Sequence, residues 1–222
     1  MKVLLSMEIP KYGDVRGSYS FTITSRLRSP AARVWAHAST FAGVNRELWP
    51  LARMTFPPAL GRLAPEAIPL GRAAFRSWVL LGRVPVEYDD FTLLELAPGR
   101  GFHESSPLLT MREWRHRRTV TPAGEGCVVR NEVTFVPGGG MRARSWPACT
   151  GVGGVFAWRH SSIRRRGGSV EDVVVIELVV PRAWLRRNRR QLWYSVRDIP
   201  PARFTRVIDF AEVAGASVDL VA

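Results

Sequence analysis

Six short strand-like segments follow one another between residues 73 and 136, and this close spacing constrains the fold more than any other feature of the sequence. Turn-forming Gly, Pro and Asp residues separate the segments. Because parallel strands need long crossover connections, strands this close together predict an antiparallel meander. The predicted strands are residues 73–81, 84–88, 91–96, 101–105, 111–121 and 127–136.

An earlier strand and two short helices are predicted before the meander. Residues 18–27 alternate between apolar and polar side chains, which is the period of a half-buried strand. Ser29-Pro30 predicts a helix start, and apolar residues continue at helical spacing as far as Phe41. Gly43 is expected to break that helix, and a second one is predicted over residues 44–51. The predicted inward side chains of the strand are Phe21, Ile23, Ser25 and Leu27.

A long helix is predicted after the meander. Pro147 opens it, and Phe156 lies on its apolar face. Gly151, Gly153 and Gly154 lie opposite that face, so the helix is expected to need tertiary packing or a close backbone approach. Arg159-His160 is predicted on the solvated side of this helix.

The large positive net charge of the chain is weaker evidence for an anionic partner than its value alone implies. The net charge is +13, but only Lys2 and Lys11 among the 32 basic residues are lysines. Scarce lysine is what a GC-rich coding sequence produces without selection for a partner. The arginine runs at 164–166 and 186–190 are therefore predicted to be solvated faces. We expect no specific nucleic-acid partner. Residues 184–194 mix arginine with aromatic residues and are compatible with peripheral membrane contact.

Three stretches carry a resemblance to a known superfamily. They are Phe21-Thr22-Ile23 through Pro30-Ala31-Ala32-Arg33-Val34-Trp35-Ala36, then Val44-Asn45-Arg46-Glu47-Leu48-Trp49-Pro50, and Met111-Arg112-Glu113-Trp114-Arg115-His116-Arg117-Arg118. Together they resemble the helix-grip (SRPBCC) superfamily of START lipid-transfer and polyketide cyclase/dehydrase-like proteins, over about residues 18–167. The resemblance implies an α+β fold in which a curved antiparallel sheet wraps around a long C-terminal helix, with two short helices after the first strand. It also implies a mostly apolar cavity between sheet and helix.

The domain boundaries follow from this resemblance. Residues 18–167 form the predicted helix-grip domain, preceded by an N-terminal segment over 1–17. Residues 168–222 form an extension that the resemblance does not cover; an added strand and helix, poor order and a frameshifted reading are the alternatives.

The predicted strand 111–121 supplies the main candidates for chemistry. Its period of two places His116 and Arg118 on one face with Trp114, and the apolar residues mark that face as the inner one. A buried histidine can act as a general base, and a buried arginine can bind a carboxylate or enolate oxygen. The alternative is a hydrogen-bonded pair with a structural role.

The second short helix supplies further candidates. In a helix-grip fold it closes one end of the cavity, so Glu47 is expected to be partly buried with a raised pKa, able to move a proton. The alternative for Asn45 and Glu47 is helix capping or inter-helix hydrogen bonding. The full predicted cavity set is Trp35, Asn45, Glu47, Trp78, Trp114, His116, Arg118 and Phe156.

Three functions stay open at this level. The first is binding of a hydrophobic small molecule, such as a lipid or polyketide, as carrier or sensor. The second is a cyclase or dehydratase in which Glu47 or His116 moves a proton while Arg118 or Asn45 stabilises an oxyanion. The third is a basic surface over residues 159–190 that binds nucleic acid or an anionic membrane.

Several classes of protein are not expected. The best apolar run, residues 173–180, is interrupted by Glu177 and is too short to span a membrane. The N-terminal apolar stretch is too short for a signal peptide, so a cytoplasmic location is expected. Cys127 and Cys149 have no metal-ligand spacing, and no phosphate-loop or dinucleotide motif is present. We therefore predict neither metal nor cofactor.

Overall fold

The computed structural model describes residues 2–8, 18–64, 67–138, 145–170, 173–179 and 218–221, with side chains described over 18–64, 67–138 and 152–170. The helices are α1 (Ala31–Ala38), α2 (Phe41–Leu48) and α3 (Ser145–Gly167). The strands are β1 (Lys2–Glu8), β2 (Tyr19–Leu27), β3 (Arg53–Met54), β4 (Phe75–Leu81), β5 (Val84–Phe91), β6 (Leu93–Ala97), β7 (Gly101–Ser105), β8 (Met111–Ala123), β9 (Gly126–Pro137), β10 (Val173–Val179) and β11 (Val218–Val221).

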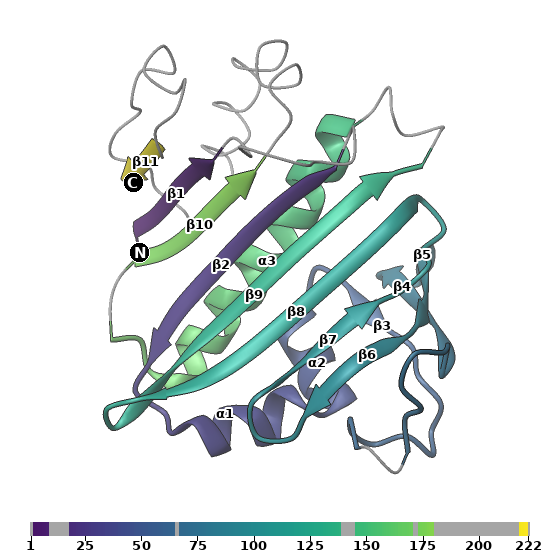
Figure 1. Cartoon of the computed structure of the whole chain (residues 1–222), viewed down its shortest axis with the longest axis horizontal. Helices are drawn as coiled ribbons and strands as arrows, with labels where there is room; N and C mark the ends of the chain where they lie inside the picture. Colours follow the sequence, from purple (N-terminus) through teal and green to yellow (C-terminus); the bar gives the residue numbers. More distant parts are fainter. Residues whose placement is uncertain are drawn as a thin grey trace.

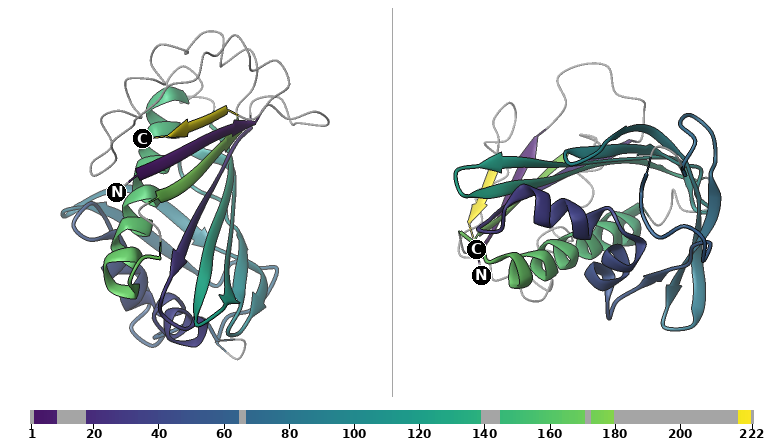
Figure 2. Two further views of the ribbon diagram at one scale, coloured as in Figure 1. Left: turned by 90° about the vertical axis from the view of Figure 1, so that its left-hand side faces the viewer. Right: turned by 90° about the horizontal axis from the view of Figure 1, so that it is seen from below.

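The protein has the α+β helix-grip arrangement. A curved sheet in the order β11-β1-β10-β2-β9-β8-β7-β6 wraps around α3, and α1 and α2 lie on the same side of it (Figures 1 and 2). From β10 through β2 to β6, every neighbouring pair is antiparallel. The described helices include none that is both long enough and apolar enough to cross a membrane.

The predicted meander divides into two sheets. β4 and β5 pair with the short β3 in a separate three-stranded sheet, and the main sheet resumes at β6. The hydrogen-bonded ladder therefore stops where the chain passes from Phe91 to Leu93, both of which are buried. This second sheet turns away from the main sheet and lies beside α2 (Figure 2).

Strands outside the predicted domain extend the main sheet. β10 pairs antiparallel with β2, and β1 pairs in parallel with β10. An added strand in the extension is thus present at 173–179, while residues 184–194, predicted to touch membranes, lie outside the described residues. The division into three segments stays a prediction.

The core lies between the concave face of the sheet and the helices. β2 buries the side chains that its alternation predicts, namely Phe21, Ile23, Ser25 and Leu27. Leu27 packs with Val34 of α1 and Ile163 of α3 in one cluster, which joins the helix ends to the sheet.

The prediction that Gly43 breaks a helix was wrong, and the glycines of α3 are a separate case. Gly43 lies inside α2, because the chain turns sharply at Ser39 and Thr40 before the second helix begins. A side chain at Gly153 or Gly154 would have nothing within 4 Å among the described residues. α3 does pack against β2 and α2, which is the other alternative that the sequence left open for this helix.

Candidate functional site

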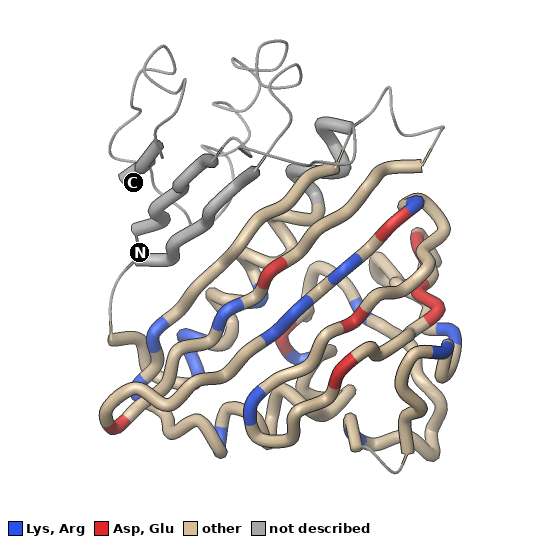
Figure 3. Tube along the Cα trace, viewed as in Figure 1, with Lys and Arg blue, Asp and Glu red and all other residues tan. Residues whose placement is uncertain are grey.

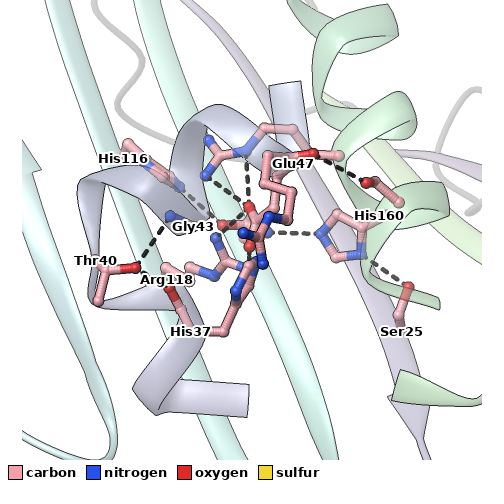
Figure 4. Close-up of polar contacts among 12 residues, drawn as sticks. Ser25, His37, Thr40, Gly43, Glu47, His116, Arg118 and His160 are labelled. Atoms are coloured by element: carbon pink, nitrogen blue, oxygen red, sulfur yellow. Dashed lines mark hydrogen bonds and ion pairs between the residues drawn. The ribbon is translucent and has the colours of Figure 1, made fainter. Parts of the chain in front are cut away.

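Three charged side chains from three elements meet in the core. Helical spacing turns Glu47 of α2 inward, and the alternation of β8 does the same for Arg118. The Arg118 guanidinium donates from both terminal nitrogens to the two Glu47 carboxylate oxygens, at 2.8 and 3.0 Å. Arg159 of α3 donates to Glu47 Oε2 from Nε at 3.2 Å and from Nη2 at 3.0 Å (Figure 4). Glu47 and Arg118 are fully buried.

The charges in this cluster determine the protonation of Glu47. Burial alone would raise its pKa, but the Arg118 and Arg159 guanidiniums outweigh burial and lower the pKa to about 2. The expected raised pKa was therefore wrong. Glu47 is an ionised counter-ion near neutral pH, and both of its oxygens already accept hydrogen bonds.

A chain of hydrogen bonds runs beside the ion cluster from β2 to β8. His160 Nδ1 lies 2.8 Å from Ser25 Oγ, and Asn131 Nδ2 donates to His160 Nε2 at 2.6 Å (Figure 4). Asn131 Oδ1 lies 2.8 Å from His116 Nε2. Because an amide oxygen only accepts, this orientation places the Nε2 proton on His116 and the Nδ1 proton on His160. Burial, reinforced by Arg118, holds the pKa of His160 well below its usual 6.5.

The chain ends at a second buried carboxylate, Glu104 of β7. Its Oε2 lies 3.4 Å from His116 Nδ1, and its Oε1 accepts hydrogen bonds from Trp114 Nε1 and Ser106 Oγ at 3.0 Å each. Burial lowers the pKa of His116, although Glu104 opposes that effect. His116 therefore has a polar partner at each ring nitrogen.

Asp89 of β5 is buried near Glu104. Burial raises its pKa well above the usual range, and the neighbouring Glu104 charge raises it further. Within the described residues, Asp89 Oδ1 and Arg118 Nε are the buried side-chain polar atoms without a hydrogen-bond partner. Asp89 therefore favours its protonated form more than an exposed aspartate does.

A cavity of about 60 Å³ lies between α2, the small sheet and the concave face of the main sheet. Most of its wall is aromatic or aliphatic, and its buried polar part comes from Ser77, Glu104, His116 and Arg159. The lining residues are Thr40, Phe41, Val44, Met54, Phe56, Leu63, Phe75, Ser77, Phe91, Phe102, Glu104, His116 and Arg159.

The structure brings some predicted site residues together. Glu47, His116 and Arg118 lie in one buried polar region, and His116 also lines the cavity. Trp114 is half-buried and binds Glu104. The Phe156 ring is buried, with its centroid 5.0 Å from that of His116, but it is not part of the cavity lining.

Other predicted cavity residues have different positions. Trp78 is 40% exposed and packs edge-on against Tyr88, so its assignment to the cavity was wrong. The period of two in β4 turns the neighbouring Ser77 inward instead. Trp35 is half-buried against the core clusters. Asn45 exchanges two hydrogen bonds with the Met54 backbone, at 2.7 and 2.9 Å, and so ties α2 to β3.

Sequence reasoning missed several members of the site. Arg159 and His160 were predicted on a solvated face, but α3 turns both into the core. Asn131 and Glu104 had a detectable signal, since each is a polar residue at an inward position of a strand whose neighbouring inward residues are apolar or small. No pattern in the neighbouring sequence indicates that Arg159 is buried, because its burial is favourable only through the ion pair with Glu47 of α2.

Comparison with known proteins gives one family and several distant structural likenesses. The sequence model of DUF8410, a domain of unknown function, matches residues 25–166. None of the curated proteins matches the chain.

The solved structures resemble the chain only distantly. Protein CV1439 from Chromobacterium violaceum is 14% identical with a TM-score of 0.48, and the match covers 64% of this chain and 94% of that one. CalU16 from Micromonospora echinospora is 15% identical with a TM-score of 0.43, covering 76% of each chain. Ara h 8.0201 is 11% identical with a TM-score of 0.45, covering 67% of this chain and 99% of that one. These values transfer no ligand or activity.

Proposed function

Because this chain belongs to DUF8410, a family of domains of unknown function, we propose its function from its own interior: the aromatic cavity binds a small hydrophobic molecule that carries a neutral polar group. One observation carries the proposal, namely a largely apolar cavity with three buried ionisable side chains in its wall. Apolar pockets with a few convergent polar groups are typical of small-molecule sites.

The charges around the cavity favour a neutral polar group on the ligand. The guanidiniums of Arg118 and Arg159 are paired with the Glu47 carboxylate, and the cavity wall carries a second buried acid, Glu104. A charged guest would have to compete with these existing pairs or be buried without a counter-ion. A hydroxyl or carbonyl oxygen needs no counter-ion, and the Arg159 guanidinium in the cavity wall can donate a hydrogen bond to such an oxygen.

The geometry favours binding over proton transfer. His116 is hydrogen-bonded to Asn131 through Nε2, and its Nδ1 lies 3.4 Å from Glu104 Oε2, so both ring nitrogens are directed at protein groups rather than at a guest. The pKa of Glu47, lowered to about 2, makes it a poor base near neutral pH. We therefore favour a carrier or sensor over the cyclase-like enzyme.

The size of the cavity sets a condition on binding. Its volume of about 60 Å³ is smaller than the roughly 150 Å³ cavity that accommodates benzene in another protein. A larger guest must displace part of the wall. Phe56 and Leu63 are the candidates, because they belong to the connection between β3 and β4 rather than to a helix or strand.

A cavity-filling variant tests the proposal. Val44 lines the cavity, so Val44→Phe is expected to weaken binding of the neutral fluorescent probe 1-aminoanthracene by tenfold or more. The measurement is a fluorescence titration of the purified full chain. Leu63→Ala, which enlarges the same cavity, should strengthen binding.

Val128→Phe is the matched control, because Val128 is a half-buried residue of β9 that does not line the cavity. It should bind the probe as the unmodified chain does. Near-ultraviolet circular dichroism checks that each variant is folded. Equal probe affinity in Val44→Phe, Leu63→Ala and the unmodified chain would show that the probe binds elsewhere and would refute the proposal. Native mass spectrometry of protein from its own host would identify a retained molecule.

A further inference from the structure

A second hollow of about 160 Å³ lies where α1, α2 and the last turns of α3 meet, separate from the aromatic cavity. We call it the arginine cleft. Its wall combines apolar side chains with the basic residues Arg33, Arg46 and Arg166, each from a different helix. The lining residues are Ser29, Arg33, Val34, His37, Arg46, Glu47, Ile163, Arg166 and Gly167.

Arg166 is held in place by the surrounding helices. It donates from Nη2 to the Arg46 carbonyl oxygen at 2.6 Å and to Ser162 Oγ at 2.7 Å, and its Nη1 lies 3.1 Å from His37 Nε2. Burial lowers the pKa of His37, and Arg166 and Arg46 lower it further against the opposing charge of Glu47. A neutral His37 accepts from Arg166, so this guanidinium has a fixed position at the cleft.

The three arginines of the cleft have no carboxylate partner in the described part of the chain. Glu47 also lines the cleft, but its two oxygens are bound by Arg118 and Arg159 in the core. Some arginines on the sheets do have such a partner, and basic and acidic positions are interspersed there (Figure 3). The ion pairs on the sheets are Arg76–Asp90, Arg117–Glu95 and Arg130–Glu132.

The C-terminal end of α3, which lies at the cleft, does not cancel this positive charge. The carbonyl oxygen of Gly167, in the last turn, accepts a hydrogen bond from Ser29 N at 3.0 Å, and that of Gly168 accepts one from Arg28 N at 2.8 Å. The cleft is therefore a concave surface with excess positive charge. The negative charge of the nearby Glu47 is already compensated by Arg118 and Arg159.

We propose that the arginine cleft binds the phosphoryl group of a small molecule. Guanidinium forks match phosphate oxygens in geometry, and three of them from three helices suit a dianion better than a single carboxylate. The open concave shape and the apolar Val34 and Ile163 suit one phosphoryl group with an attached apolar part. This proposal does not depend on a ligand in the aromatic cavity.

Isothermal titration calorimetry with inorganic phosphate tests the inference on the full chain at constant ionic strength. Saturable binding at one site is expected, with weaker binding of acetate. Arg33→Gln and Arg46→Gln each remove one guanidinium without touching the backbone atoms that hold Arg166. Each variant should weaken phosphate binding by about tenfold, because a charge-assisted hydrogen bond is lost.

Arg83→Gln is the control, since it removes the same charge from an exposed position in the β4–β5 turn. It should leave phosphate affinity within about twofold of the unmodified chain. An equal loss in Arg83→Gln, or no saturable phosphate binding in the folded unmodified chain, overturns the proposal. Thermal melts confirm that the variants fold.

A second experiment with lipid vesicles distinguishes a lipid headgroup from a soluble molecule as the source of the phosphoryl group. The chain is sedimented with phosphatidylcholine vesicles, with and without phosphatidic acid, and inorganic phosphate is added as competitor. Phosphate-sensitive binding to the phosphatidic acid vesicles, lost in Arg33→Gln, assigns the group to a lipid headgroup. Saturable phosphate binding without such sedimentation assigns it to a soluble molecule. The proposal that the cleft binds a phosphoryl group is refuted if the calorimetry shows no phosphate binding and if neither phosphate nor Arg33→Gln reduces vesicle binding.

Discussion

Glu47 is the residue whose surroundings most affect its chemistry. Its carboxylate is the shared acceptor of Arg118 and Arg159, and no part of it reaches water. A buried ion pair adds little net stability when compared with apolar residues of the same size. Removing one partner is a different matter, because the remaining buried charge is then uncompensated.

We predict that Glu47→Gln lowers the free energy of unfolding by about 3–5 kcal/mol, since two buried guanidiniums lose their counter-ion. Urea unfolding at pH 7 measures the change. Glu95→Gln is the matched control, because Glu95 pairs with Arg117 at the surface and should contribute less than about 1 kcal/mol.

The same residue predicts an acid dependence. The pKa of Glu47 is about 2 in the folded chain against 4.5 ordinarily, so its contribution to stability is complete above pH 4.5 and is lost as the pH falls toward 2. The stability difference between the unmodified chain and Glu47→Gln should therefore shrink over that interval. A difference that stays constant would contradict the ionised state assigned to Glu47.

At the scale of elements, the junction of α1 and α2 depends on Gly43. Thr40 accepts a hydrogen bond from Gly43 N at 3.0 Å and donates to the His37 carbonyl oxygen at 2.9 Å. A Cβ at position 43 would lie 1.9 Å from that carbonyl oxygen. The two helices therefore approach each other at a distance that only glycine permits, and this approach places Glu47 over Arg118.

We predict that Gly43→Ala lowers the free energy of unfolding by about 1–3 kcal/mol, because α2 must move away from α1 to relieve the overlap. Chemical denaturation measures the loss. Gly61→Ala is the control, since a Cβ there would have nothing within 4 Å, and its stability should change by less than about 1 kcal/mol. Equal effects at the two positions would show that α1 and α2 tolerate a wider separation.

At the scale of the whole molecule, one hydrogen-bonded chain joins α3 to the sheet. Ser25, His160, Asn131 and His116 come from β2, α3, β9 and β8, and their hydrogen bonds cross the core between the layers. Burial keeps His160 neutral, with its pKa well below 6.5. Protonating it would place a charge beside Arg118 and remove the acceptor that Asn131 uses.

Stability should therefore fall as the pH drops below about 6.5. The folded pKa of His160 is lowered, so the unfolded chain binds more protons in that range and is favoured by acid. His160→Gln should reduce the slope of unfolding free energy against pH between 7.5 and 5.5. His103→Gln, at a half-buried surface position of β7, should leave the slope unchanged. Identical slopes in all three chains would exclude His160 as the titrating group.

Much of the fold follows from local pattern. The strand segments, the two short helices and the long helix were predicted within a few residues, and so were the inward faces of β2 and β8. Side-chain alternation and helical spacing are properties of neighbouring residues, so the sequence shows them directly. The second helix was shifted, starting at Phe41 instead of residue 44, because a glycine chosen for close packing resembles a helix breaker.

The sequence by itself missed the inward turn of Arg159 and His160 on α3. It did determine the inward faces of β2 and β8, and so it identified His116 and Arg118 and the α+β class. Only the tertiary structure decided their chemistry. Glu47 meets Arg118 and Arg159 across 71 and 112 residues of chain, and these contacts lower a pKa that burial alone would raise. Charge state and hydrogen-bond partners depend on groups brought together from distant segments, which local periodicity does not encode.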